Sequence, residues 1–209
     1  MLLLIDALIH PYAFFDVPVI NAVQTVEHEH ARGLTAHLAW LTGAEGAILS
    51  WLLVLVTVAA CRWWSATLVT LIMPVGGLLN TLISDVIVSR TRPHLSELVR
   101  GSTNWEEGSF PSGHVMGAVI LYGFVFFLAT RLDRYWVRVP LQVVSLAVLV
   151  SVGVGRIWQG AHWPTDVLAA YALGGMVLIG LVALERHLRT HPVGEAVRAL
   201  IKGMHRPVA

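Results

Sequence analysis

Residues 139–184 read VPLQVVSLAVLVSVGVGRIWQGAHWPTDVLAAYALGGMVLIGLVAL, and this stretch decides the fold class. Two uncharged runs, Val139–Gly155 and Val167–Leu184, flank a short segment that carries Arg156, His162 and Asp166. A helix crosses a bilayer with roughly 20 mostly apolar residues. The stretch therefore predicts two membrane-spanning helices joined by a short loop with polar, chemically versatile side chains.

Three more runs with no charged residue have a similar character: Gly46–Cys61, Trp63–Ser84 and Val115–Thr130. The chain of 209 residues is 56% hydrophobic and only 13% charged, whereas a soluble domain is about a quarter charged. We therefore expect an all-α, polytopic membrane helix bundle of about five spans. The net charge of +1 gives no basic footprint for nucleic acid, and the sequence leaves the oligomeric state open.

The sequence divides into three parts around this bundle. Residues 1–45 are expected to form an N-terminal amphipathic segment, because the apolar stretch Met1–Ile9 is too short and interrupted to span and suits a helix lying in the interface. Residues 46–185 form the predicted membrane catalytic domain, and residues 186–209 a basic cytoplasmic tail.

One cluster in the N-terminal part resembles a metal site. Residues 27–30 alternate Glu and His, but neighbouring residues on a helix diverge by about 100° and cannot all face one ion. A solvated helix face is the favoured interpretation, so we expect neither a metal nor another cofactor.

Cationic side chains are distributed unevenly between the two sides of the five predicted spans. One side carries Arg62, Arg131, Arg134, Arg138, Arg186, Arg189, Arg198, Lys202 and Arg206, and the other carries Arg32, Arg90, Arg92, Arg100 and Arg156. An excess of Lys and Arg marks the cytoplasmic side of a membrane protein. The second side is therefore expected to face outward, together with the N-terminal segment.

The ends of the predicted spans also carry tryptophans, which is typical of interface anchors. These are Trp63, Trp64, Trp136, Trp158 and Trp163.

The outward side gathers the residues that suit phosphoryl chemistry. Arg92 ends the second predicted span, His114 begins the third, Arg156 ends the fourth, and His162 and Asp166 begin the fifth. Cleaving a phosphoester requires a nucleophile, cationic or N–H groups for the phosphoryl oxygens, and a proton for the leaving oxygen. Up-and-down threading brings all three kinds of group to one membrane face.

His162 and Asp166 are four residues apart, so they share a face if the fifth helix includes both. A carboxylate that accepts a proton from one imidazole nitrogen leaves the other nitrogen free to attack. His162 is therefore a candidate nucleophile that forms a phosphohistidine. Pro164 suits the first turn of a helix, and the alternative for Asp166 is a helix-start charge favoured by the macrodipole.

The segment Pro111-Ser112-Gly113-His114 precedes an apolar run. Ser112 suits an N-cap, Gly113 permits close approach of a ligand to the backbone, and free amides at a helix N-terminus bind anions. His114 can then protonate the leaving oxygen. An ordinary cap followed by a surface histidine is the alternative on this segment alone.

Arg92 and Arg156 can each present a planar fork to phosphate oxygens. Snorkelling of the two side chains to the interface is the other interpretation.

These segments resemble the three signatures of the type-2 phosphatidic acid phosphatase (PAP2) superfamily. The first signature is Lys, six residues, then Arg-Pro, and Arg92-Pro93 matches its second half. The second, Pro-Ser-Gly-His, is met in full by residues 111–114. The third is Ser-Arg, five residues, His, three residues, Asp, and Arg156, His162 and Asp166 keep this spacing. The resemblance covers about residues 46–184.

The resemblance implies a haloperoxidase-like helical core and a phosphatase that hydrolyses lipid phosphates without a metal. It implies His162 as nucleophile, His114 as general acid and Asp166 as the residue that orients the nucleophile. Around the phosphate it implies Arg92, Ser112, Gly113 and Arg156.

Two positions depart from the signatures. The lysine position falls on Asp85, and Gly155 stands in place of the serine. Asp85 can pair with an arginine, recognise a cationic group on the substrate, or mark weakened catalysis. Arg90 lies nearby, but about 200° from Arg92 on a helix, which predicts that it points elsewhere.

The sequence thus predicts an integral phosphatase of a bacterial inner or cell membrane with an extracytoplasmic site. The expected substrates are polyprenyl pyrophosphate, phosphatidylglycerol phosphate or phosphatidic acid. Two alternatives stay open: a lipid phosphotransferase that uses the same intermediate, and a catalytically weakened lipid-binding or assembly protein.

Overall fold

The computed structural model describes residues 12–25, 29–88, 90–94 and 108–191, and every regular element within these ranges is helical. The elements are α2 (Asp16–Gln24), α3 (Glu29–Thr42), α4 (Ala44–Ala60), α5 (Trp64–Ile72), α6 (Pro74–Thr81), the π-helical turn η1 (Leu82–Val88), α7 (Gly113–Ala129), α8 (Tyr135–Trp158) and α9 (Pro164–Thr190). The predicted all-α class is confirmed.

Within the described ranges, three helical stretches are long and apolar enough to cross a bilayer: residues 64–88, α8 and α9. Residues 32–42 and α4 form a pair bent by 62° that counts as a fourth crossing if taken together, and α7 is a shorter apolar helix. Each of the five predicted runs therefore lies on helical structure. The protein is an integral membrane protein.

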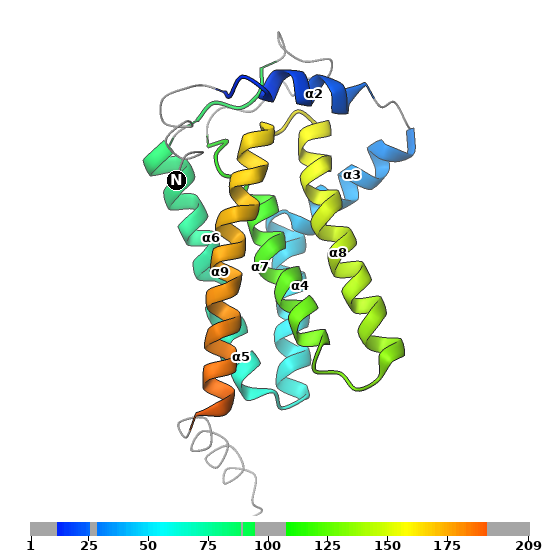
Figure 1. Cartoon of the computed structure of the whole chain (residues 1–209), viewed down its shortest axis with the longest axis vertical. Helices are drawn as coiled ribbons and strands as arrows, with labels where there is room; N and C mark the ends of the chain where they lie inside the picture. The colour runs from blue at the N-terminus through cyan, green and yellow to red at the C-terminus, as the bar shows by residue number, and fades with distance from the viewer. Residues whose placement is uncertain (1–11, 26–28, 89, 95–107, 192–209) are drawn as a thin grey trace, which may run out of the picture.

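Helix α7 occupies the middle of the bundle and packs along both α8 and α9 (Figure 1). Its side chains Val115 and Phe124 are fully buried in the main core, where they meet Val152 of α8 and Ala170 of α9. Large apolar side chains cover the outside of the bundle; Leu53, Leu78, Val86, Met176 and Ile179 are all well exposed. Such a surface suits hydrocarbon rather than water.

Helix α2 lies across one end of the bundle, above the ends of α8 and α9 (Figure 1). Its residues Asp16, Ile20 and Gln24 are fully buried beneath it. This helix closes the end of the bundle at which the sequence places the candidate site.

The tryptophans correct one expectation. Trp64, Trp158 and Trp163 are buried, while Trp136 is exposed and carries the Arg134 guanidinium 5.7 Å from its ring centroid. Burial of the first three supports packing rather than interface anchoring, because an anchor presents its ring to the headgroups.

Some predictions lie outside the described residues: the interfacial helix over residues 1–9, the side chains of residues 27–30, and most of the 186–209 tail. The three-part division of the chain stays a prediction. Among the described residues, no three His, Cys, Asp or Glu side chains gather as metal ligands.

Candidate active site

The seven predicted site residues are brought to the end of the bundle beneath α2. The C-terminal end of α8, the loop after it and the first turn of α9 supply Arg156, His162 and Asp166. The segment 90–94 supplies Arg92. The N-terminal end of α7 supplies Ser112, Gly113 and His114.

Both ring nitrogens of His162 have defined neighbours. Nδ1 lies 2.9 Å from the Ser109 carbonyl oxygen, and this contact requires that Nδ1 carry the proton. Nε2 is then the unprotonated nitrogen, and it lies 3.2 Å from Nη1 of Arg92. The ring is thus held in the tautomer whose free nitrogen faces a guanidinium, where a phosphate can bind.

The pKa of His162 is shifted by its surroundings. Burial lowers the pKa below its ordinary value, and the nearby charges of Arg92 and Arg156 lower it further, while Asp166 opposes the shift. The neutral imidazole, which is the nucleophilic form, is therefore favoured.

Asp166 holds the loop around His162 rather than bonding the ring directly. Its Oδ2 is 3.8 Å from His162 Nδ1, which is too long for a hydrogen bond. That oxygen accepts hydrogen bonds from the Ser109 hydroxyl at 2.5 Å and the Trp163 backbone N–H at 2.9 Å. Helix α9 begins at Pro164, as predicted, so His162 lies outside the helix. The shared helix face expected from the spacing is therefore not formed.

Arg92 is clamped by backbone carbonyls. Its Nη1 donates to the Ala161 carbonyl at 3.1 Å, and its Nη2 donates to the Gly108 carbonyl at 3.2 Å. Burial lowers the pKa of Arg92, whereas the carboxylates of Asp166 and Asp85 raise it. Gly108 has φ +75°, a backbone conformation that favours glycine, so this residue type is suited to presenting its carbonyl to Arg92.

The N-terminal end of α7 forms the opposite wall. Ser112 is at the N-cap position, as predicted, but its side chain makes no capping hydrogen bond. The hydroxyl is buried and has no hydrogen-bond partner within the described part of the chain. A methyl group on Gly113 would come within 3.0 Å of Asn80 Nδ2, so glycine permits the close approach of α7 and α6. The free amides of this helix end suit an anion.

His114 and Arg156 complete the cluster. The His114 ring is hydrogen-bonded to the Ala39 backbone. Arg156 is buried and donates from Nη1 to Gln159 Oε1 at 2.9 Å. Burial of Arg156 rules out snorkelling to the interface. At Gly155 an added methyl group would lie 3.3 Å from Thr35 Cγ2 of α3.

Four residues around the site escaped the sequence argument: Asp16, Arg90, Ser109 and Thr165. Arg90 does not point away, because it donates to Asp166 Oδ1 at 2.7 Å. The predicted angle of about 200° between Arg90 and Arg92 assumed a helix at both residues. The π-helical turn ends at Val88, and Arg90 is outside it. The position of Thr165 beside Asp166 was a weak indication that it belongs to the site. Nothing in the sequence connects residue 16 to residue 165.

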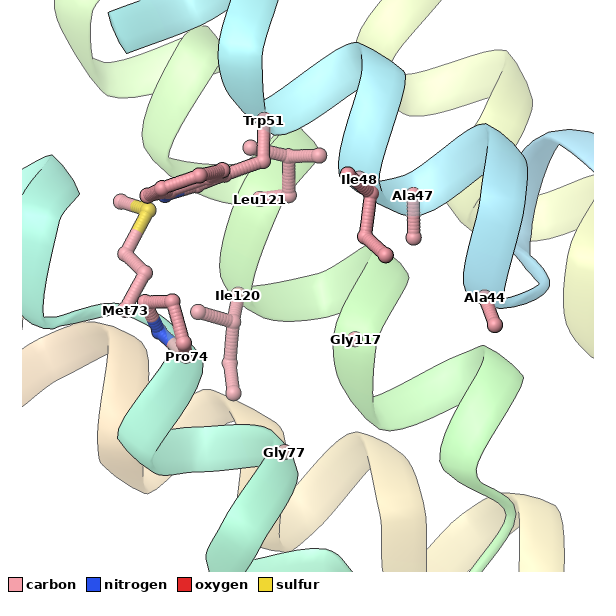
Figure 2. A pocket seen from close by; sticks show the side chains of 10 residues that line it. All are labelled: Ala44, Ala47, Ile48, Trp51, Met73, Pro74, Gly77, Gly117, Ile120 and Leu121. Atoms are coloured by element: carbon pink, nitrogen blue, oxygen red, sulfur yellow. The ribbon is translucent and has the colours of Figure 1, made fainter.

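An apolar pocket of about 350 Å³ begins one helical turn below this site (Figure 2). Figure 2 shows it between α4, α6 and α7, with Trp51 and Ile48 of α4 facing Met73, Pro74 and Ile120. Gly117 of α7 and Gly77 of α6 also line it, and both lack side chains that would fill it.

The site therefore combines an unprotonated imidazole nitrogen, a buried and a half-buried guanidinium (Arg156 and Arg92), an unbonded hydroxyl and a helix N-terminus. A model of the PAP2 superfamily matches residues 63–189, more than half of the chain. The chain belongs to the PAP2 superfamily. The predicted resemblance to this superfamily is thus confirmed.

PAP2 relatives are found at moderate identity. The chain is 30% identical over 117 residues to a phosphatidylglycerophosphatase B from Bacillus subtilis, covering 54% of each chain. It is 36% identical over 77 residues to an undecaprenyl-diphosphatase from Sulfolobus acidocaldarius, covering 37% of this chain and 34% of the relative. It is 33% identical over 119 residues to a lipid A 1-phosphatase from Rhizobium etli, covering 54% of this chain and 47% of the relative. The chain thus spans about half the length, or less, of these curated relatives.

Solved PAP2 structures share the fold. A transmembrane PAP2 type phosphatidylglycerolphosphate phosphatase from Bacillus subtilis superposes with a TM-score of 0.73 over 88% of this chain and 93% of its own, at 18% identity. LpxE of Aquifex aeolicus superposes with a TM-score of 0.59 over 86% of this chain and 99% of its own, also at 18% identity. At this identity the likeness concerns the fold alone.

Proposed function

We propose that the protein is a membrane phosphatase that hydrolyses a lipid phosphate or pyrophosphate through a phosphohistidine, without a metal. The observation that carries the proposal is the setting of His162. Its Nδ1 is held 2.9 Å from the Ser109 carbonyl, and its Nε2 is 3.2 Å from the Arg92 guanidinium. An oriented nucleophile beside a phosphate-binding cation is the minimum that phosphoryl transfer requires.

In the proposed reaction, His162 Nε2 attacks the phosphorus atom, the N–P bond forms and the P–O bond to the leaving group breaks. His114 gives a proton to the leaving oxygen. Water then attacks the phosphohistidine, His114 takes a proton from that water, and inorganic phosphate leaves. Arg92, Arg156, the Ser112 hydroxyl and the N–H of Gly113 stabilise the phosphoryl oxygens, and preorganised donors of this kind contribute most of the catalysis in such sites.

A lipid substrate is supported by the position of the site beside hydrocarbon. The pocket in Figure 2 is lined by apolar residues of three spans and suits an acyl or isoprenoid chain whose headgroup reaches His114. The relatives named above act, by their names, on phosphatidylglycerophosphate, undecaprenyl diphosphate and lipid A. We propose the same broad class here, presented at the extracytoplasmic face.

The test uses purified protein in detergent with EDTA present. Polyprenyl pyrophosphate, phosphatidylglycerol phosphate and phosphatidic acid are supplied in turn, and inorganic phosphate is measured. We expect release from at least one substrate, inhibition by orthovanadate, and loss of release in His162→Ala. His187→Ala is the matched control, because His187 is exposed at the opposite end of α9 and its loss is expected to leave turnover unchanged.

Four results contradict the proposal. Retained turnover in His162→Ala excludes the nucleophile, and loss of activity in EDTA excludes the metal-free route. Transfer of phosphate to an added lipid alcohol in place of release identifies a phosphotransferase. No turnover of any substrate, with binding retained, identifies a lipid-binding protein.

A further inference from the structure

We propose that Asp16 of α2 is a positioning residue for the reaction, acting on Asp166 and the His162 loop through Arg90 and Thr165. The inference rests on the proposed function, since it assigns a role at the same site. Asp16 precedes Arg90 by 74 residues and Thr165 by 149 residues in the chain, and no signature of the superfamily contains it.

Asp16 is fully buried and both of its carboxylate oxygens are bonded. Oδ1 accepts the Thr165 backbone N–H at 2.9 Å. Oδ2 accepts the Thr165 hydroxyl at 2.7 Å, an Arg90 N–H at 3.1 Å and the Ala13 backbone N–H at 2.8 Å. The carboxylate thus holds the first turn of α9, and negative charge at a helix N-terminus is favourable.

Arg90 links this carboxylate to Asp166. Its Nη2 donates to Asp16, while its Nη1 donates to Asp166 Oδ1 and to the Thr165 hydroxyl, both at 2.7 Å. Asp166 in turn binds the Ser109 hydroxyl, and the Ser109 carbonyl holds His162 Nδ1. An unbroken chain of contacts therefore runs from α2 to the proposed nucleophile.

The arrangement also sets the charge behind His162. The Arg90 guanidinium lies between two carboxylates, because it bonds both Asp16 and Asp166. The His162 ring lies between this group and a second guanidinium, since Asp166 Oδ2 is 3.8 Å from Nδ1 and Arg92 Nη1 is 3.2 Å from Nε2. In a low-dielectric interior such charges act strongly on one another.

This charge balance makes opposite predictions for two variants. Asp16→Asn removes negative charge and leaves Arg90 with Asp166 alone, so the pKa of His162 falls. Arg90→Gln removes positive charge, so the pKa of His162 rises. A residue that served only to pack α2 against the bundle would not move the His162 pKa in opposite directions in these two variants.

The experiment measures both turnover and the His162 titration. ¹⁵N-histidine-labelled full-length protein in detergent is titrated by NMR, with the His162 resonances assigned from a His162→Gln sample. Phosphate release from the best substrate is measured on the same preparations. We expect Asp16→Asn and Thr165→Val to lower kcat by about tenfold to a hundredfold with little change in KM, because misplacement of a catalytic group costs this much.

Controls separate positioning from folding. Asp133→Asn removes an exposed carboxylate at the other end of the bundle. It is expected to change neither kcat nor the pKa of His162. Asp16→Glu keeps the charge and is expected to restore part of the lost kcat. Arg90→Lys keeps the positive charge if Arg90→Gln does not fold.

The proposal is overturned if Asp16→Asn retains full kcat, or if the His162 pKa moves in the same direction in Asp16→Asn and Arg90→Gln. Failure of the proposed role of Asp16 can be told apart from failure of the proposed phosphatase function. A wild-type protein without turnover refutes the phosphatase, whereas the two opposed titration shifts still test the link from Asp16 to His162.

Discussion

The ring of His162 is fixed by a backbone carbonyl, and Asp166 acts one step behind it. Sequence patterns predicted both side chains, because histidine and aspartate at this spacing have a recognisable chemistry. They could not predict Ser109, since the group that contacts the ring is a carbonyl that any residue carries. Arg90 was misjudged for a related reason: its direction depends on where a helical turn stops, and that is set by packing.

The buried setting of His162 yields a measurable titration. Burial lowers its pKa, so the ring stays neutral to a lower pH than a free histidine, whose pKa is about 6.5. We expect the NMR midpoint of His162 in the wild-type protein to lie below 6.5. A His162 midpoint above that of a free histidine contradicts the account.

Asp85 is the main departure from the superfamily signatures. Its charge reaches Arg92, so we propose that it offsets part of the positive charge offered to phosphate. Asp85→Asn is expected to tighten orthovanadate inhibition by about twofold to fivefold, as exposed charge pairs are weak. Asp133→Asn is the control, and weaker inhibition in Asp85→Asn would assign the carboxylate a favourable role of its own.

At the scale of helices, the long apolar runs were the most predictable part of the fold. All five fall on helices because a bilayer requires every backbone group to be bonded within its own segment. The internal breaks were not predicted. Residues 63–84 are one expected span and lie on one helical crossing, but the structure separates α5 from α6 at Pro74, which lacks an N–H and begins α6 at its first position. The 62° bend before α4 lies at Gly43, whose backbone is extended rather than helical.

The contact between α7 and α9 depends on a glycine. A methyl group on Gly174 would lie 3.0 Å from Val119 Cβ and 3.2 Å from the Met116 carbonyl oxygen, and neither neighbour has a flexible end that can swing away. Gly174→Ala is therefore expected to lower stability by about 1–3 kcal/mol, measured as a loss of thermal stability in detergent.

Gly175→Ala is the matched control, because nothing lies within 4 Å of the added methyl group. Alanine favours helix over glycine by up to about 1 kcal/mol, so this variant is expected to be as stable as the wild type or more so. Equal melting temperatures for the two variants would show that α7 and α9 have room to separate.

On the scale of the whole molecule, the two ends of the bundle have different polar groups. The site lies beneath α2, while the other end holds buried Glu185, which accepts hydrogen bonds from Ser65 and Arg131 at 2.8 Å each. Arg131 also lies over the Trp63 ring at 4.2 Å. These contacts join α5, the end of α7 and α9 at the end that the charge distribution predicts to be cytoplasmic.

The orientation can be tested with the single cysteine. Cys61 is exposed after α4, at the end opposite the site. In intact cells a membrane-impermeant maleimide is expected to leave it unlabelled, and permeabilised cells are expected to show labelling. In a Cys61→Ser, His94→Cys variant the thiol lies beside the site, and it is expected to be labelled in intact cells. Labelling of Cys61 in intact cells would invert the proposed topology.

The bond from Asp16 to Thr165 has a consequence for how the protein is made. Asp16 is translated early, and Thr165 follows 149 residues later, after α3 to α8 have been translated. His162 immediately precedes α9 and Asp166 lies in its first turn, so the site cannot assemble before this part of the chain has been translated. Insertion of α9 therefore completes the site and secures α2 in a single step.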